Sequence, residues 1–376
     1  MHRPTHSLGR IFAYTAAGVL AAAALSLTAA PTDPESPIRL GSNENAFGYT
    51  PKAKDAMIAA IESGNYYNRN EVDEMVKIAA AKEGVQPDFI YPTAGSGPVL
   101  ELTAAAFSKP GLNIVTTTPG YPQLTGAFTK WGGTIKYTPV DAKMGYDFAA
   151  LAAAIDENTA VVYICNPNNP TGVLADPAEL RKFVMTAPPH VLVFVDEAYL
   201  ELADSGLMPN TVAPLVKLRR NLIVSRTFSK AYALAGLRAG YGIGHPDTLA
   251  KLRKYDLGLA PSFLAAIAAQ EAMKDQEYME LNRKRYAEVR NYTKKQLDRL
   301  GLAYADPQGA FILFKSGMDS AEVVKKMLAE NIMVTRPFGI APGDEPKYAD
   351  WVRVSLGNME EMQLFVSALE KTLGKN

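Results

Sequence analysis

Polar residues that could do chemistry follow three apolar runs of the sequence, at the point where each run ends. Residues 166–172 follow the run 160–165, and Asp196 follows the run 191–195. Thr227 to Lys230 follow the run 222–225 in the same way. In open α/β sheets, ligands bind beyond the carboxyl ends of the strands. We therefore expect these polar side chains to converge at one edge of a sheet.

Lys230 and Arg238 suggest an amine nucleophile beside a phosphate pocket. A lysine in partly dry surroundings has a lowered pKa and can attack an aldehyde as an amine nucleophile. Arg238 lies in a glycine-containing segment eight residues later, and its guanidinium could bind a phosphate together with the hydroxyls of Thr227 and Ser229. A solvated surface lysine is the other interpretation of Lys230.

Asp196 is expected at the rim of a dry core, because it directly follows five apolar residues. An ionised carboxylate in such a place needs a cationic partner. A protonated pyridine nitrogen would be one such partner. A helix N-cap is the alternative role, since aspartate is common there.

A second candidate anion site lies at Ser96 and Gly97. These residues belong to the segment 95–98, which precedes a helical stretch over 99–107. The backbone N–H groups at the start of a helix bind anions. A glycine-rich turn without a ligand is the alternative interpretation.

The pattern around these residues predicts a doubly wound α/β domain. The runs 113–116, 160–165, 191–195 and 222–225 are rich in Val and Ile without polar alternation, which is typical of parallel strands covered on both faces. Between them, Asp176, Pro177 and Glu179 combine the signals of a helix start.

Beyond residue 280 the pattern changes to that of an α+β module. We expect a charged helix over 283–300, a strand over 310–314, a helix opened by Asp319 or Ser320, an alternating strand over 351–356 and a last helix capped by Asn358. The alternation predicts a sheet that is exposed on one face.

Three segments, in this order and spacing, resemble the class I/II aminotransferases of fold type I, which depend on pyridoxal 5'-phosphate (PLP). They are Asn-Pro-Asn-Asn-Pro-Thr-Gly at 166–172, Asp-Glu-Ala-Tyr at 196–199 and the segment 225–238. The arrangement is most similar to the histidinol-phosphate aminotransferase branch and runs from about Leu40 to the C-terminus. The resemblance implies a large PLP-binding domain over 65–279 with a mostly parallel sheet. It also implies a smaller α+β domain formed by 280–376 and the N-terminal segment 31–64.

The resemblance implies a role for each candidate residue in cofactor binding. Lys230 would form the Schiff base with PLP, Asp196 would pair with the pyridine nitrogen, and Tyr199 and Asn169 would hydrogen-bond the phenolic oxygen. Tyr121 would stack on the ring. The phosphate would be bound by residues of two segments, namely Ser96, Gly97, Thr227, Ser229 and Arg238.

The resemblance also implies contacts to substrate and to a second subunit. Arg353 would bind the carboxylate or equivalent anionic group of the substrate, with a salt bridge as the alternative. Asn45 belongs to an N-terminal active-site segment, and Arg336 is either a second anion contact or a solvated arginine. Tyr67, with Tyr66 as the alternative, would reach the phosphate of the neighbouring subunit, so that a homodimer is expected.

The implied reaction is transfer of an amino group from an amino acid or a histidinol-phosphate-like amine to a 2-oxo acid. Lys230, Asp196 and Tyr199 would be the catalytic residues. Ala310 stands where relatives commonly carry asparagine, which leaves the amino donor open. A PLP-dependent decarboxylase or lyase on the same fold is the second hypothesis, and a non-catalytic binding domain is the third.

Composition argues against several other partners. Lys plus Arg and Asp plus Glu both number 39, so no net charge attracts nucleic acid. The single cysteine, Cys165, excludes an internal disulfide, and the four histidines lack metal-ligand spacing, so that no metal site is expected. A small-molecule substrate is favoured.

The first 30 residues resemble a secretory signal peptide. His2, Arg3 and Arg10 precede the apolar stretch 11–27, and small residues follow at 28–30, as at a cleavage site. A retained anchor is the alternative. We expect an exported, periplasmic protein if the signal functions, and a cytoplasmic one otherwise.

Overall fold

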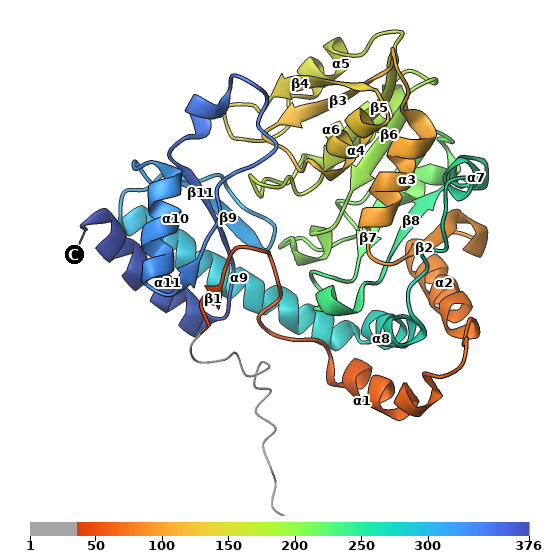
Figure 1. Cartoon of the computed structure of the whole chain (residues 1–376), viewed down its shortest axis with the longest axis horizontal. Helices are drawn as coiled ribbons and strands as arrows, with labels where there is room; N and C mark the ends of the chain where they lie inside the picture. The colour runs from red at the N-terminus through yellow and green to blue at the C-terminus, as the bar shows by residue number, and fades with distance from the viewer. Residues whose placement is uncertain (1–35, 376) are drawn as a thin grey trace, which may run out of the picture.

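The computed structural model describes residues 36–375, which surround a central seven-stranded sheet (Figure 1). Every strand of this sheet runs in the same direction except β8, which is antiparallel to both of its neighbours. The large, mostly parallel sheet predicted from the sequence is confirmed. In spatial order its strands are β2 (Ile90–Thr93), β8 (Gly240–Gly244), β7 (Leu222–Thr227), β6 (Leu192–Asp196), β5 (Thr159–Cys165), β3 (Asn113–Thr118) and β4 (Thr134–Pro139).

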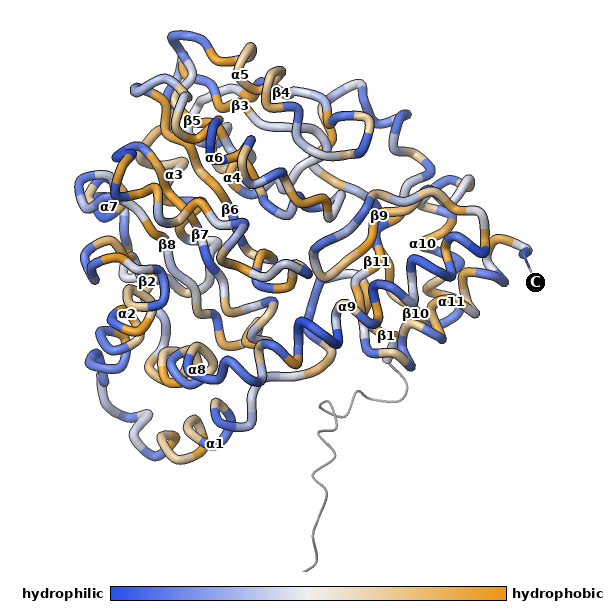
Figure 2. Tube along the Cα trace, turned by 180° about the vertical axis from the view of Figure 1, so that it is seen from behind, coloured by the Kyte–Doolittle hydropathy of each residue, from blue (hydrophilic) through white to orange (hydrophobic). Residues whose placement is uncertain are grey.

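Helices cover both faces of the sheet, and neighbouring strand residues are buried in different apolar clusters. Val161 packs in the cluster that includes residues of α3 (Gly97–Phe107), α4 (Gln123–Lys130) and α7 (Pro246–Arg253). Val162, the next residue, packs in the cluster that includes α2 (Asn70–Glu83), α5 (Phe148–Ala153), α6 (Pro177–Thr186) and α8 (Phe263–Lys274). This burial on both sides explains why the strands show no polar alternation. Figure 2 shows the apolar residues concentrated along the central strands.

The C-terminal part forms a smaller layer of two short sheets and three helices. The long helix α9 (Gln276–Arg299) leads from the large sheet into this part (Figure 1). There β9 (Phe311–Lys315) pairs with β11 (Trp351–Ser355), next to α10 (Ser320–Ala329) and α11 (Met359–Leu373). Asp319 caps α10, and Asn358 forms a capping box at the start of α11.

The expectation that this sheet is exposed on one face is wrong. Four of the five residues of β9, and four of the five of β11, are buried. On one face Phe314 packs against Phe365 of α11, and on the other Phe311 packs against Tyr199 of the large domain. The second face is covered because the two domains meet there.

The N-terminal segment contacts both parts of the molecule. Strand β1 (Ile38–Arg39) pairs with β10 (Ile332–Met333) in the small domain, whereas α1 (Pro51–Ala60) packs against α8 of the large domain. Short 3-10 helices complete the described chain: η1 (Ile61–Ser63), η2 (Pro87–Phe89), η3 (Leu200–Leu202), η4 (Ala213–Lys217), η5 (Ala235–Leu237) and η6 (Glu345–Tyr348).

Within residues 36–375, no helix is both long enough and apolar enough to cross a membrane. The predicted signal peptide lies outside the described residues.

Candidate active site

A cavity of about 460 Å³ lies where β5, β6 and β7 end, beside the residues that follow β3. Chain order along the sheet reverses between β3 and β5, and ligands of open α/β sheets bind at such a switch point. Most of the residues selected from the sequence line this one cavity: Ser96, Gly97, Tyr121, Asn169, Asp196, Tyr199, Thr227, Ser229, Lys230, Arg238 and Arg353.

Lys230 follows β7 and is partly buried rather than fully solvated. Its Nζ donates to the backbone oxygens of Ser42 and Asn43, at 3.2 and 3.1 Å. Burial, together with the positive charge of Arg353, lowers the pKa of Lys230 to about 8. A neutral amine, the form that attacks an aldehyde, is therefore accessible near neutral pH.

Asp196 is the last residue of β6 and is 2% exposed. One carboxylate oxygen accepts a hydrogen bond of 2.8 Å from the Ser225 hydroxyl, and the other lies 3.5 Å from the hydroxyl of Tyr163. Burial raises the pKa of Asp196 to about 6, while these hydrogen bonds oppose the rise. Asp196 caps no helix, because an irregular turn follows it. A buried carboxylate of this kind is stabilised by a cation such as a protonated pyridine nitrogen.

Tyr199 stands at the centre of a hydrogen-bonded chain. Its hydroxyl oxygen accepts from the side-chain amides of Asn43, at 3.1 Å, and Asn169, at 3.2 Å. With both lone pairs used, its O–H is left to donate to a ligand in the cavity. Burial raises the pKa of Tyr199, so the hydroxyl keeps its proton at neutral pH.

Arg353 is a buried cation with no carboxylate partner among residues 36–375. It is 4% exposed, and its guanidinium lies 4.8 Å from the ring centre of Phe338 and 5.4 Å from that of Phe311. Terminal nitrogens donate to Asn169 Oδ1 at 2.8 Å and to the oxygen of Gly41 at 2.5 Å. Its Nε has no partner within the described part of the chain. The salt-bridge alternative therefore finds no partner here, and the arrangement suits an incoming anion.

At the other end of the cavity, Arg238 meets the start of α3. Its guanidinium donates to Ser229 Oγ at 3.2 Å, and the hydroxyls of Ser229 and Thr227 lie 3.0 Å apart. Gly95 has a φ of +87°, and a Cβ there would come within 2.3 Å of the Arg238 guanidinium. A larger residue at position 95 would displace the guanidinium from this position. Hydroxyls, a guanidinium and the free N–H groups of a helix start form a cradle that fits a phosphate group.

Tyr121 lines the cavity, and its ring and that of Phe338 pack in an edge-to-face arrangement at a centroid distance of 6.2 Å. Its hydroxyl donates to Gln123 Oε1 at 3.1 Å, and burial raises its pKa to about 12. Gln123 was not selected from the sequence. Its place at the first turn of α4 gives no signal that its side chain faces a ligand site.

Asn43, for which no role was predicted, lines the cavity, whereas Asn45 does not. Asn45, the predicted substrate contact, donates to the backbone oxygen of Lys230 at 2.9 Å and does not line the cavity. Asn43 lines it instead. The reason is local: Asn43 has a φ of +54°, a left-handed conformation that asparagine tolerates and that redirects the chain.

Three other selected residues lie outside the cavity of their own chain. Tyr66 and Tyr67, 67% and 98% exposed, border a second cavity of about 530 Å³. Arg336 borders a third and donates through Nε to Ser320 Oγ at 3.1 Å. Thr335 pairs with Arg353, and because successive residues of an extended chain point to opposite sides, Arg336 is directed away from Thr335.

Comparison with known proteins identifies the family. The sequence model of the family described as aminotransferase class I and II matches residues 35–369. The chain belongs to the class I and II aminotransferases. Histidinol-phosphate aminotransferase of Moorella thermoacetica is 34% identical over 336 residues, which are 89% of this chain and 85% of that protein. Histidinol-phosphate aminotransferase 2 of Pseudomonas fluorescens is 36% identical over 343 residues, covering 91% and 90% of the two chains.

Solved structures agree with this assignment. A putative histidinol-phosphate aminotransferase from Erwinia carotovora superimposes with a TM-score of 0.84 at 27% identity, over 90% of this chain and 96% of that one. Histidinol-phosphate aminotransferase from Sinorhizobium meliloti, in complex with PLP, gives 0.82 at 27% identity, over 90% and 91%. This aminotransferase is a PLP enzyme of fold type I, and its cavity has the donor set that PLP requires.

Proposed function

We propose that this PLP-dependent aminotransferase takes a donor amine that carries an anionic group and passes its amino group to a 2-oxo acid. The observation that supports the proposal is that Lys230 and Arg353 line the same cavity. Lys230 can bind the cofactor, and Arg353 lines the same cavity as a cation without a carboxylate partner among residues 36–375. The names of the relatives add histidinol phosphate as a specific candidate donor, beside the amino acids.

The side chains of the cavity have separate tasks in this proposal. PLP, when bound, supplies an electron sink for negative charge at the donor's α-carbon. Lys230, as a neutral amine, would accept the α-proton and return it. Asp196 stays ionised and holds a proton on the ring nitrogen, while Tyr199 and Asn169 bind the ring oxygen. Arg238 and the start of α3 bind the phosphate.

A donor screen tests this function. Purified protein loaded with PLP is mixed with individual amino acids or histidinol phosphate, and transfer of the amino group to 2-oxoglutarate is followed. Transfer from at least one anionic donor supports the proposal. Release of carbon dioxide or of an elimination product without transfer would replace it with the decarboxylase or lyase hypothesis. The variant K230A, which keeps the cavity but lacks the amine, is the negative control.

We further propose that the enzyme acts as a homodimer in which Tyr67 reaches the neighbouring site. Exposed apolar side chains near Tyr67 support a subunit contact: Ile58, Ile61, Tyr66 and Leu257 are 59%, 58%, 67% and 89% exposed. A second subunit on this surface would cover these side chains.

A complementation experiment tests the dimer. In a hybrid dimer of one Y67A chain and one K230A chain, one of the two sites has both a native Lys230 and a native Tyr67. Mixing and reassociating the two weakly active variants should therefore restore activity. A monomer by sedimentation, or no recovery on mixing when both variants still dimerise, would refute the shared site.

We also propose that the first 30 residues direct export. The family match begins only at residue 35, so the charged and apolar segment before it is additional to the aminotransferase. Cell fractionation with N-terminal sequencing of the mature protein tests this. A cytoplasmic protein that retains its first residues would contradict export, and an intact protein in the membrane fraction would identify an anchor.

A further inference from the structure

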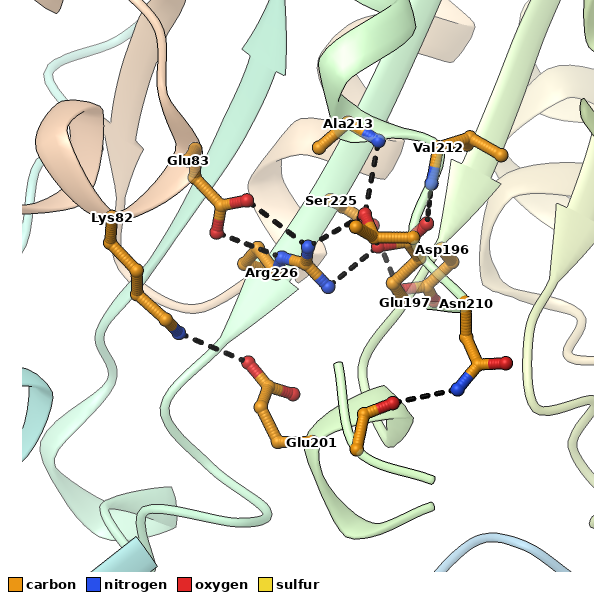
Figure 3. A network of polar contacts seen from close by, with 12 residues as sticks. Lys82, Glu83, Asp196, Glu197, Glu201, Asn210, Val212, Ala213, Ser225 and Arg226 are labelled. Carbon is orange, nitrogen blue, oxygen red and sulfur yellow. Dashed lines mark hydrogen bonds and ion pairs between the residues drawn. The ribbon is translucent and has the colours of Figure 1, made fainter. Parts of the chain in front are cut away.

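A buried ionic network lies beside the cofactor cavity, around the ends of β6 and β7. Its centre is Arg226, which is 1% exposed and lies between Glu83 at the end of α2 and Glu197 just after β6 (Figure 3). Nε and one terminal nitrogen of Arg226 donate to the two oxygens of Glu83 at 3.1 and 3.2 Å. The other terminal nitrogen forms an ion pair of 2.6 Å with Glu197.

Hydroxyl and amide groups complete the network. Tyr241 of β8 donates to Glu83 at 2.8 Å. Thr211 donates to Glu197 at 2.8 Å and accepts from Arg226 at 3.0 Å, and the backbone N–H of Val212 donates to Glu197 at 2.9 Å. The three charged residues therefore join α2, β6, β7 and the segment before η4 through side chains that are almost fully buried.

Glu197, just after β6, and Arg226, in β7, are each adjacent in the chain to a residue that lines the cofactor cavity. Asp196 directly precedes Glu197, and Arg226 stands between Ser225 and Thr227. Successive side chains of a strand point to opposite faces. Ser225 and Thr227 therefore face the cavity side, where Ser225 bonds Asp196, while Arg226 faces the network. Because Arg226 and Thr227 are adjacent in the chain, as are Glu197 and Asp196, a shift of the network side chains would also displace the residues of the cavity.

The ion pairs of the network are not expected to contribute much net free energy to the stability of the fold. Burial of charges has a large desolvation cost, and apolar residues of similar size often stabilise a core equally well or better. What the ion pairs supply is a unique geometry, because one planar guanidinium must meet two carboxylates from different elements at once.

We propose that Arg226 is a positioning residue that fixes the ends of β6 and β7 relative to each other, so that Asp196, Thr227 and Lys230 converge on PLP. The proposal concerns how the cofactor site is held, and it stands whichever amine is the donor. No group of the network itself touches the cavity.

The variant R226M tests the proposal, with R290M as a matched control. Arg290 is also a 1% exposed arginine, paired with Asp204 and with the backbone oxygens of Leu202 and Gly309, but it does not adjoin the cavity-lining strand ends. Three quantities are measured: the melting temperature, the dissociation constant of PLP, and the pH midpoint of Lys230 modification in the cofactor-free protein, followed on the Lys230 peptide by mass spectrometry.

Both variants should lower the melting temperature. Only R226M should weaken PLP binding by about tenfold or more, as expected for an ångström-scale displacement of binding groups. It should also move the Lys230 midpoint upward from about 8, since a displaced lysine is better solvated. R226K should recover part of the affinity, because one ammonium restores the charge but cannot bind both carboxylates in the same way.

Unchanged PLP affinity and Lys230 midpoint in folded R226M, or equal losses in R290M, would overturn the proposal. If R226M does not fold, the triple variant E83Q/R226M/E197Q removes all three charges and relieves the unpaired carboxylates. That protein should fold yet still bind PLP about tenfold more weakly, whereas wild-type affinity would reduce the network to a structural role.

Discussion

Replacement of Ser225 by alanine isolates one interaction that sets the charge of Asp196. The hydroxyl of Ser225 donates to the Asp196 carboxylate at 2.8 Å, and both residues are buried. The change removes only this hydroxyl. The remaining contacts of Asp196, to the hydroxyl of Tyr163 and the backbone N–H of Ala198, stay in place.

The expected size of the effect follows from the strength of a charge-assisted hydrogen bond. Such a bond contributes about 1.5–3 kcal/mol, and one pKa unit corresponds to about 1.4 kcal/mol. The pKa of Asp196, about 6 in the cofactor-free protein, should therefore rise by about one to two units in S225A. At pH 7 the ionised fraction would fall from about nine-tenths to between about one-tenth and one-half.

Carbon-13 NMR of labelled aspartate carboxyl groups measures this midpoint directly in the cofactor-free protein, with D196N to assign the signal. The affinity for PLP at pH 7 should fall in parallel, because a neutral carboxyl does not stabilise a protonated ring nitrogen. T293V is the control: Thr293 is equally buried, and its hydroxyl bonds Val289 at 2.7 Å in α9, away from the cavity. An Asp196 midpoint in S225A within about 0.3 units of the wild type, well below the calculated rise, would refute the assigned role of the Ser225 hydroxyl.

Three further outcomes are expected. R353M should lower kcat/KM for anionic donors by about 30-fold or more, which corresponds to a lost charge-assisted hydrogen bond of about 2 kcal/mol. R336M should have little effect on kcat/KM. Equal losses in the two variants would refute the distinction between the two arginines. Modification of Lys230 in the cofactor-free protein should accelerate as pH rises, with a midpoint near 8, because only the neutral amine reacts, and a midpoint near that of free lysine would contradict the burial argument. G339A should destabilise the fold by about 1–3 kcal/mol in thermal unfolding. Gly339 has a φ of +63°, and a Cβ there would lie 1.7 Å from the oxygen of Gly120. G343A is the control for backbone strain without a clash, because Gly343 has a φ of +89° but open space around it.

Most of the cofactor site could be predicted from the sequence because its residues follow strands in short, dense segments. Asp196 and Lys230 each come within a few residues of an uninterrupted apolar run, and the carboxyl ends of parallel strands meet at one sheet edge. The position of these two residues in the sequence was therefore enough to predict that they lie close together in the fold. Arg336 and Asn45 do not line this cavity, because their direction depends on one backbone turn or one residue of strand register.

The sequence by itself determined the large parallel sheet, the family and most of the residues that line the cavity, since these follow from periodicity and from motifs whose members are close in the chain. Tertiary structure alone decided that Arg353 lies between Phe311 and Phe338, that Asn43 rather than Asn45 faces the cavity, and that Glu83 meets Arg226. Glu83 and Arg226 are 143 residues apart in the chain, and the placement of Asn43 depends on a single left-handed residue. Such contacts arise only when the two domains and the sheet pack against each other, and no local pattern encodes that packing.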